Sequence, residues 1–443
     1  MLDPQTGWLV SVVFSLVIGL GFAFWKGAET GLGIAVVASC LFPDWLEYPL
    51  AGMPFTVRTT VCALAIFAYA LRYPWRIKSP LIPLDFAVAG LVVAHIITDY
   101  HYGVGWLAGL RGYGEWALPY VCGRYALRRN ENPVILGWAV CTLLVLLSIG
   151  AMIEVATKTN VWEVVFGNRS GQFPRDAMRY GLKRAYGNTI HPIFYAMQLV
   201  VLLPWPIYLW RATENVSART IAGAVLLIAF IGSISTVSRS PILAFIAVPV
   251  FALAVKFVWA RWLAGLAVIA VLVLMFQSPV DFTKDAAAAA GDEFKQVYIG
   301  DEKVPISSLM TRFWLYRVYW PALQDGGLLG YGTQATSEFP VDVPKRPKNA
   351  DTLYMFRWID NAYILLGLRF GLIGLIAYVI FLLTAIGTGL SLRRDRYWST
   401  MAISFASTYL TLAMMLLSVW MSYDFGFEAL WMAGVIGGIR SEQ

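Results

Sequence analysis

Several polar side chains stand at the ends of long apolar segments, where their chemistry is uncommon. Arg239 lies in SISTVSRSPILAF, between two apolar stretches and among Ser and Thr residues. Arg312 and Arg317 follow in TRFWLYRVYW, and Asp360 with Asn361 directly precedes AYILLGLRFGLIG. An arginine at a membrane boundary costs free energy unless it is paired or reaches water, so such residues often mark functional sites.

These residue types suit a reaction in which negative charge develops near a membrane surface. Guanidinium groups bind phosphate through paired hydrogen bonds. The hydroxyls around Arg239 and the first amides of the following helix would add to an anion site. A carboxylate such as Asp360 can act as a general base toward a hydroxyl, with Asn361 orienting it or the substrate. The structural alternatives are that Arg239 only reaches out to the interface and that Asp360 only caps a helix.

A basic segment precedes the apolar stretch that begins near residue 190. It contains six basic residues against two acidic ones: Lys158, Arg169, Arg175, Arg179, Lys183 and Arg184 against Glu163 and Asp176. Arg184 and His191 close it, in KRAYGNTIHPIFYAM. The segment predicts an anion-attracting rim. The alternative is a long loop that is tolerated whatever its charge.

Two further patterns concern aromatic and acidic groups. The stretch SSLMTRFWLYRVYWPALQDG predicts an amphipathic helix that ends near Gly326 and lies along the membrane interface or stacks on sugar rings. Five residues correspond to about 140° around a helix, so we expect only one of its two arginines, Arg312 or Arg317, to face a site. His95 and Asp99 stand one turn apart and could pair, with His95 in a structural role.

Composition indicates a polytopic membrane protein. The chain is 58% hydrophobic and 14% charged, whereas soluble domains have about 25% charged residues. The net charge is +7. We expect the basic residues responsible for it to lie mostly in cytoplasmic loops and not to form a nucleic-acid-binding site. The four cysteines lie in apolar segments without metal-ligand spacing, and we expect neither a metal site nor a cofactor.

Apolar segments of span length predict an all-α transmembrane bundle of about 12–13 helices. We place them near 8–25, 28–46, 56–72, 83–99, 113–127, 134–156, 190–210, 219–236, 241–257, 260–277, 361–390, 398–420 and 425–440. The short basic loops alternate in one parity, which assigns them to the cytoplasm. The segments 100–112, 157–189, 237–240, 278–360 and 421–424 are then outside.

The connection from 278 to 360 is far longer than the others and is rich in aromatic residues. Loops of that length are usually functional or disordered. We expect a partly helical cap, which divides the chain into a bundle at 1–277, an extracytoplasmic loop at 278–360 and C-terminal helices at 361–443.

In these motifs the sequence resembles the O-antigen ligase and O-antigen polymerase superfamily of bacterial envelope glycan assembly. The resemblance covers the C-terminal two-thirds: GNTIHP, the Ser238-Arg239 turn, the long loop with its arginine and the GLLGYG turn, and DNAYILLGLRFGLIG. It implies a GT-C-like fold in the bacterial cytoplasmic membrane, with the site facing the periplasm. Asp360 stands where ligases typically have a histidine, a departure that favours a polymerase.

The resemblance also implies a metal-independent, inverting glycosyltransferase. Its donor would be an undecaprenyl-pyrophosphate-linked glycan, and its acceptor a glycan, a lipid A-core or a protein, with a chain-length regulator as a candidate partner. Arg239 and Arg312 match the arginines that hold the pyrophosphate, and Asp360 would be the base. We expect the substrate-binding residues to be Arg184, His191, Asn361, Arg317 and Tyr363. A ligase and, from another class, a polysaccharide or lipid transporter are the alternatives.

Overall fold

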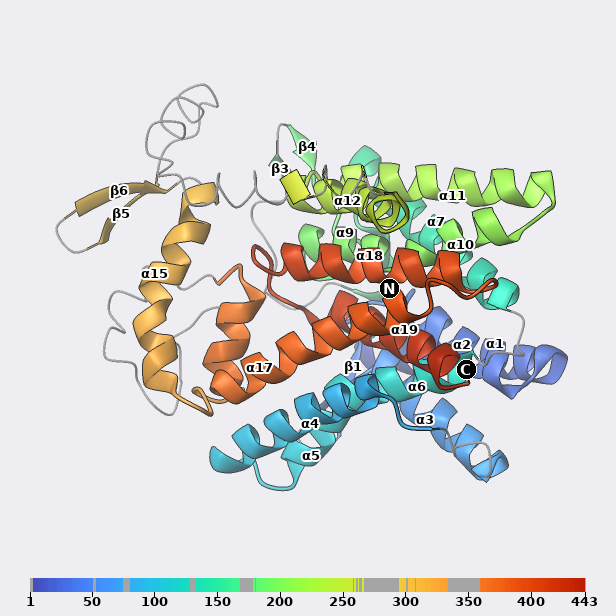
Figure 1. Cartoon of the computed structure of the whole chain (residues 1–443), viewed down its shortest axis with the longest axis horizontal. Helices are drawn as coiled ribbons and strands as arrows, with labels where there is room; N and C mark the ends of the chain where they lie inside the picture. Colours follow the sequence, from blue (N-terminus) through green and yellow to red (C-terminus); the bar gives the residue numbers. More distant parts are fainter. Residues whose placement is uncertain are drawn as a thin grey trace.

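The computed structural model describes the chain except at a few short gaps and in most of the segment from 258 to 358. The described residues are 3–50, 53–74, 80–127, 133–167, 178–179, 181–257, 259, 262, 265–266, 295–299, 302–306, 308–333 and 359–442. Helices dominate this part of the chain, and its strands form three short antiparallel hairpins (Figure 1). The predicted all-α bundle is confirmed.

The described part of the chain contains the following helices and strands, given in the order of the sequence. The helices are α1 (Pro4–Lys26), α2 (Ala28–Ser39), α3 (Val57–Arg72), α4 (Pro83–His101), α5 (Leu107–Gly112), the π-helical turn η2 (Tyr113–Ala117), α6 (Leu118–Ala126), α7 (Pro133–Thr157), α8 (Val161–Phe166), α9 (Pro192–Val201), α10 (Pro204–Ala212), α11 (Val216–Ser235), α12 (Arg239–Lys256), α15 (Ser308–Gly326), α17 (Ala362–Ser391), α18 (Ser399–Met415) and α19 (Tyr423–Ser441). The hairpins pair β1 (Glu47–Leu50) with β2 (Met53–Thr56), β3 (Met178–Arg179) with β4 (Leu182–Lys183), and β5 (Lys295–Ile299) with β6 (Glu302–Ile306).

Twelve of the thirteen predicted spans coincide with helices, and the remaining one, at 260–277, lies almost entirely outside the described residues. Within the described part, six helices are long and apolar enough to cross a membrane: α1, α4, α7, α9 together with α10, α11 and α17. The other predicted spans within the described part form further helices of the bundle, some of them short, such as α2 with 12 residues and α6 with 9. The chain is a multi-pass membrane protein.

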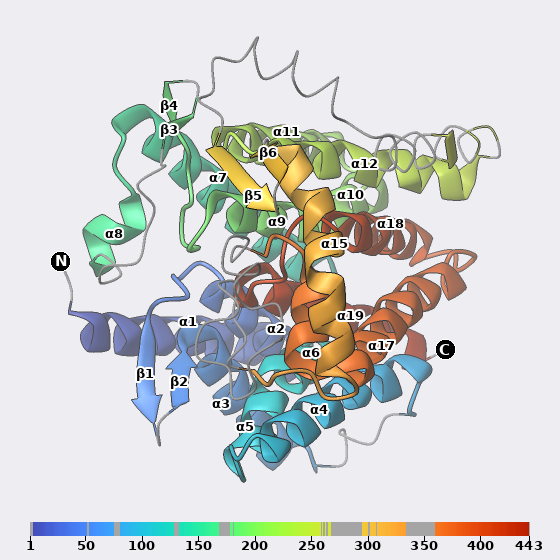
Figure 2. The same ribbon diagram turned by 90° about the vertical axis from the view of Figure 1, so that its left-hand side faces the viewer.

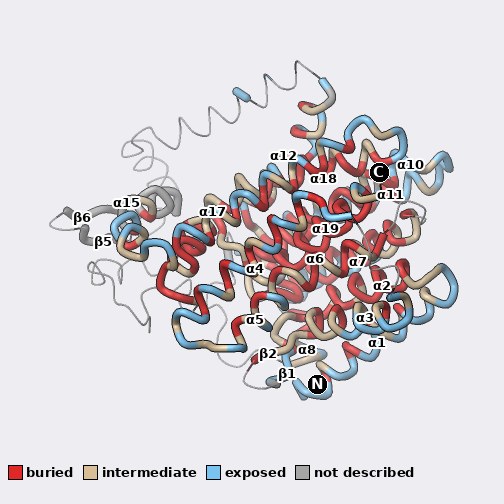
Figure 3. The backbone as a smooth tube through the Cα atoms, turned by 60° about the horizontal axis from the view of Figure 1, so that its bottom comes forward, coloured by how far each residue is buried: buried red, intermediate tan, exposed pale blue. Residues whose placement is uncertain are grey.

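The core lies where α6 and α19 cross, and buried residues concentrate there (Figure 3). Glycines let the two helices approach closely. A methyl group added at Gly123 would lie 2.0 Å from the Trp431 carbonyl oxygen, and one added at Gly434 would lie 2.0 Å from that of Tyr120. Such small-residue contacts are typical of helix pairs in membranes, where close packing replaces the hydrophobic drive.

The helix α17 is broken within the bundle, at Gly371, where φ is 64° and ψ is −159°. The turn at 327–332, which follows α15, inserts at this break and satisfies the backbone groups that the break exposes. The hydrogen bonds run from Tyr331 N to Leu368 O (2.6 Å), Gly332 N to Arg369 O (3.1 Å), Leu372 N to Gly327 O (3.1 Å) and Ile373 N to Leu328 O (3.2 Å). In a membrane such a break persists only where other groups take up its hydrogen bonds.

The predicted helix in the long loop is confirmed as α15. It lies at one end of the bundle, at the left of Figure 1 and facing the viewer in Figure 2. Leu315 and Tyr319 of α15 share a small core with Ile364 and Leu368 from the first half of α17. This core and the inserted turn fix the described part of the loop against α17.

Candidate functional site

A cavity of about 750 Å³ opens beside the first half of α17. Its lining comes from five segments that are distant in the sequence: 44–59, 104–116, residue 190, 362–370 and 420–430. Several of them belong to or adjoin the loops 100–112, 157–189 and 421–424, which the charge pattern predicts to be outside. The volume is in the range of pockets that bind small-molecule ligands.

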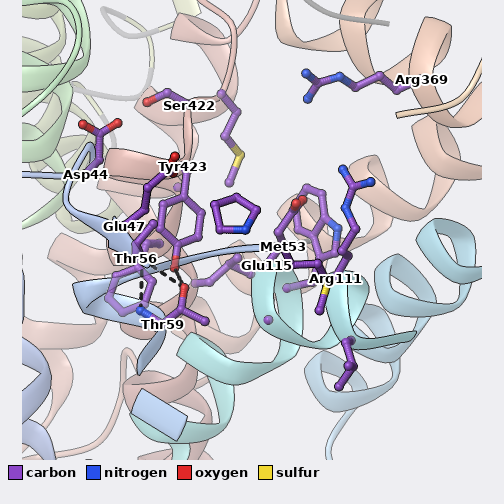
Figure 4. Close-up of a pocket in the computed structure, with 18 of the residues that line it drawn as sticks. Asp44, Glu47, Met53, Thr56, Thr59, Arg111, Glu115, Arg369, Ser422 and Tyr423 are labelled. Atoms are coloured by element: carbon purple, nitrogen blue, oxygen red, sulfur yellow. Dashed lines mark hydrogen bonds between the residues drawn. The ribbon is translucent and has the colours of Figure 1, made fainter. Parts of the chain in front are cut away.

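The charged side chains of the cavity stand on two sides (Figure 4). Arg111 and Glu115 lie on one wall, with Arg369 of α17 above them, and Asp44 and Glu47 lie on the opposite side. Aromatic residues fill much of the remaining lining: Phe55, Trp116, Phe370, Trp420, Tyr423 and Phe427. The cavity therefore combines hydrogen-bond donors, acceptors and aromatic faces.

A buried network holds Arg111 in place. Asp99 is fully buried and lies 3.6 Å from the Arg111 guanidinium. It accepts hydrogen bonds from His95 Nε2 (3.1 Å) and from the hydroxyl of Thr333, just after the inserted turn. Trp116 Nε1 donates to His95 Nδ1 (3.0 Å), which leaves the imidazole proton on Nε2. The predicted pairing of His95 with Asp99 is confirmed.

A second polar group forms at the start of α12. Arg184 donates one hydrogen bond to the Ser238 hydroxyl (2.9 Å) and one to the Thr236 carbonyl oxygen (3.3 Å). Ser238 is buried, and the next residue is Arg239, which is exposed. The structure thus brings together Arg184 and Arg239, which are 55 positions apart in the sequence. Two guanidiniums beside a helix N-terminus form a basic corner suited to an anion.

The turn before this corner has an uncommon backbone. Val237 adopts a φ of 49°, in the left-handed region, which for a β-branched residue costs about 1–3 kcal/mol. The hydrogen bonds of Arg184 to the residues on either side, Thr236 and Ser238, help to hold this conformation. Strain of this kind clusters at functional sites.

His191 stands between the basic corner and the cavity. Its Nδ1 accepts a hydrogen bond from the amide of Ile193 (3.2 Å), so the histidine caps α9. Burial, and then the nearby Arg184 guanidinium, lower the pKa of His191 to about 4. The imidazole is therefore neutral at physiological pH. Its neighbour Ile190 lines the cavity.

Aromatic rings connect the two regions. The ring of His191 lies 5.3 Å from that of Phe194, whose ring lies 4.7 Å from that of Trp420. Trp420 lines the cavity and also packs against the core between α15 and α17.

At the start of α17 the two predicted polar residues have different surroundings. Asn361 is buried, and its amide donates to the Tyr316 hydroxyl (2.5 Å) and the Leu417 carbonyl oxygen (2.7 Å). Its oxygen accepts from the amide of Ile364 (2.9 Å) and so caps the helix. Asp360 is exposed. The alternative in which Asp360 caps the helix is wrong, because Asn361 does so.

The remaining predicted residues occupy the same end of the molecule. Tyr363 donates from its hydroxyl to the Ala413 carbonyl oxygen of α18 (2.8 Å). Arg312 and Arg317 lie in α15, but their side chains are outside the described residues. Arg312 lies one helical turn before Tyr316. The Tyr316 hydroxyl accepts a hydrogen bond from the Asn361 amide. The backbone of α15 therefore brings Arg312 to the start of α17.

Part of the basic segment has a structural role. The Lys183 ammonium lies 3.6 Å from the buried Glu154, whose other oxygen accepts from the amides of Tyr186 (3.3 Å) and Gly187 (3.0 Å). Arg169 and Arg175 lie outside the described residues.

Of the five charged residues in the cavity lining, sequence reasoning singles out Arg369, which is costly in lipid and is expected to face the bundle interior, and misses the other four. Asp44, Glu47, Arg111 and Glu115 belong to no motif, and tertiary packing alone brings them together. One signal was available in the sequence. Arg111 and Glu115 stand four residues apart at the end of the predicted outer segment 100–112, a spacing that places both on one face of a helix.

One comparison with known proteins concerns the region just described. Residues 224–379 match the family model described as O-antigen ligase. The matched segment runs from within α11 through α12 and α15 into α17, and so contains Arg239, Arg312 and Asp360. No curated protein matches the chain. The chain is therefore a multi-pass membrane protein whose residues 224–379 are similar to the O-antigen ligase family.

Proposed function

We propose that the chain transfers a glycan from an undecaprenyl-pyrophosphate donor to a hydroxyl acceptor outside the cytoplasmic membrane, as a polymerase of O-antigen or exopolysaccharide. The observation that supports this most directly is the basic corner, where Arg184 binds Ser238 beside Arg239. Ser238 and Arg239 lie within the segment that matches the ligase family, and Arg184 binds to it through Ser238.

The donor's leaving group explains the arginines. When the glycosyl–pyrophosphate bond breaks, negative charge grows on the diphosphate lipid, and fixed guanidiniums stabilise it without reorganisation. Arg239 and Arg184 would hold one phosphate, and Arg312, from the helix that covers the start of α17, would hold the other. A neutral His191 would donate from Nε2, because its Nδ1 already accepts from the Ile193 amide.

The acceptor hydroxyl needs a base on the opposite side of the anomeric carbon, because inversion proceeds in line. Asp360 is exposed at the loop–helix junction and would take that proton. Asn361 would position Asp360 rather than bind substrate, since both amide hydrogens already have protein acceptors. Tyr363 would support the same junction through α18.

A ligase is the second candidate, favoured by the description of the matching family. Asp360 in place of the histidine typical of ligases favours the polymerase. The two candidates share donor chemistry and differ in the carrier of the product.

The test is a reconstituted assay with the full chain in lipid nanodiscs and a radiolabelled glycan on undecaprenyl pyrophosphate. A polymerase yields longer glycans that remain on the lipid carrier. Transfer to lipid A-core or to a protein would replace the polymerase by the ligase. A parallel assay places the chain in sealed lipid vesicles. Movement of the labelled lipid from one face of the vesicle to the other without any new glycosidic bond would reject both candidates and support a transporter.

A further inference from the structure

We infer that the 750 Å³ cavity is a saccharide subsite that selects electrically neutral sugar units over acidic ones. This inference rests on the proposed glycan transfer and adds the class of sugar that the acceptor side accepts. The basic corner at Ser238 and Arg239 is a separate region, and neither residue lines the cavity.

The charges of the cavity disfavour an acidic ligand. Three carboxylates line it, Asp44, Glu47 and Glu115, against the two guanidiniums of Arg111 and Arg369. The fully buried Asp99, 3.6 Å behind Arg111, compensates that cation further. A uronic acid or a phosphate would therefore enter a site whose lining has more carboxylates than guanidiniums, and like charges brought together in a binding site repel each other.

The same groups suit the hydroxyls of a neutral sugar. A guanidinium only donates hydrogen bonds and a carboxylate only accepts them, whereas a hydroxyl does both. Donors and acceptors stand on one wall, at Arg111 and Glu115, and acceptors stand opposite, at Asp44 and Glu47 (Figure 4). Trp116 and Trp420 add apolar surface for the carbon faces of sugar rings.

The guanidinium of Arg111 and the backbone of Arg369 are held in place by the protein itself. Arg111 is oriented by Asp99, which is bound by His95 and Thr333. Arg369 lies two residues before the break at Gly371, and its carbonyl oxygen accepts from the amide of Gly332 in the inserted turn. Preorganised groups lose less entropy on binding, which favours selective recognition of weakly bound sugars.

A binding experiment tests the selectivity without any donor lipid. The full chain in nanodiscs is titrated with maltotetraose and with tetragalacturonate, by saturation-transfer NMR. We expect maltotetraose to bind at least about tenfold more tightly. The double variant Glu47→Gln/Glu115→Gln should abolish this preference, mainly by strengthening tetragalacturonate binding. The matched double variant Glu214→Gln/Glu442→Gln, remote from the cavity lining, should keep it.

Three binding results would overturn the inference. They are tighter binding of tetragalacturonate by the unmodified protein, an unchanged preference in Glu47→Gln/Glu115→Gln, and no binding of either probe up to its solubility limit.

A kinetic experiment separates this inference from the proposed function. In the transfer assay, Arg369→Met should raise the KM for the acceptor at least about tenfold and leave the KM for the lipid donor unchanged. Arg219→Met, an exposed arginine outside the cavity, should change neither. If the unmodified protein transfers glycan but Arg369→Met leaves the acceptor KM unchanged, the subsite is wrong and the function stands. If the unmodified protein transfers nothing, the function fails and the binding experiment decides the subsite.

Discussion

The guanidinium of Arg184 donates a hydrogen bond of 2.9 Å to the hydroxyl of Ser238. Through this contact the end of the basic segment meets the start of α12, where Arg239 is exposed. The strained Val237 lies in the same turn. The relationship explains how residues far apart in the sequence form one cationic surface, and it makes Ser238 a positioning residue for Arg184.

Replacing Ser238 by alanine should weaken donor binding. A hydrogen bond to a charged group contributes about 1.5–3 kcal/mol, so the KM for the lipid donor should rise about tenfold or more while the acceptor KM is unchanged. The matched control is Ser217→Ala, at an exposed position near the start of α11, which should alter neither value. Equal donor KM values in the two variants would show that Ser238 does not position Arg184.

Two glycines of the inserted turn should respond differently to alanine. Gly330 and Gly327 both have a positive φ, 69° and 61°. A Cβ at Gly330 would lie 2.4 Å from the Leu368 carbonyl oxygen, whereas one at Gly327 meets nothing within 4 Å. Gly327→Ala should cost about 1–2 kcal/mol of stability from its backbone alone. Gly330→Ala should cost at least about 1–3 kcal/mol more, because the turn cannot enter the break in α17.

Denaturation of the two glycine variants in mild detergent measures this difference. Equal stabilities would mean that the turn does not fill the break at Gly371.

Acid should destabilise the protein through His191. Its pKa is about 4 in the folded chain and about 6.5 when unfolded. The unfolded state therefore binds more protons between these values, and stability falls as pH drops from about 6.5 to about 4, by up to about 3 kcal/mol. His191→Asn keeps an acceptor for the Ile193 amide and should flatten this part of the pH profile. His101→Gln, at an exposed position, should leave the profile unchanged.

Melting temperatures between pH 4 and pH 7 in a common buffer series would check this prediction. A profile that is equally steep in His191→Asn and in the unmodified protein would assign the acid sensitivity to other groups.

The adjacent residues Asp360 and Asn361 should separate activity from stability. Asp360 is exposed, so Asp360→Asn should leave the melting temperature unchanged and reduce the rate of transfer at least about a hundredfold, as loss of a general base does. Asn361→Ala removes a helix cap and two buried hydrogen bonds, so it should cost about 2–4 kcal/mol of stability. A fully active Asp360→Asn variant would require another base.

The sequence predicted the parts of the structure that depend on local pattern. Apolar runs located the helices, and the aromatic segment with its glycines located α15 and the turn after it. The turn between two helices at 237–240, which contains Ser238 and Arg239, was also predicted. His95 and Asp99 were predicted to pair because residues four apart on a helix are neighbours.

Contacts between distant segments could not be predicted in this way. The break in α17 lies in AYILLGLRFGLIG, which is apolar apart from Arg369. The turn that takes up its hydrogen bonds lies about forty residues earlier in the sequence. Arg111 has its counter-charge, Asp99, on α4, and Asp44 and Glu47 reach the cavity from the β1–β2 region. No periodicity relates these positions.

The proposed role of the guanidiniums at the start of α12 is to stabilise a diphosphate leaving group. It is tested most directly by the rate of glycan transfer from undecaprenyl pyrophosphate in the Arg239→Met variant, compared with Arg219→Met as a control at another exposed arginine. We predict that the control keeps the rate of the unmodified protein and that Arg239→Met loses at least about a hundredfold in kcat. Equal rates in the two variants would contradict the account.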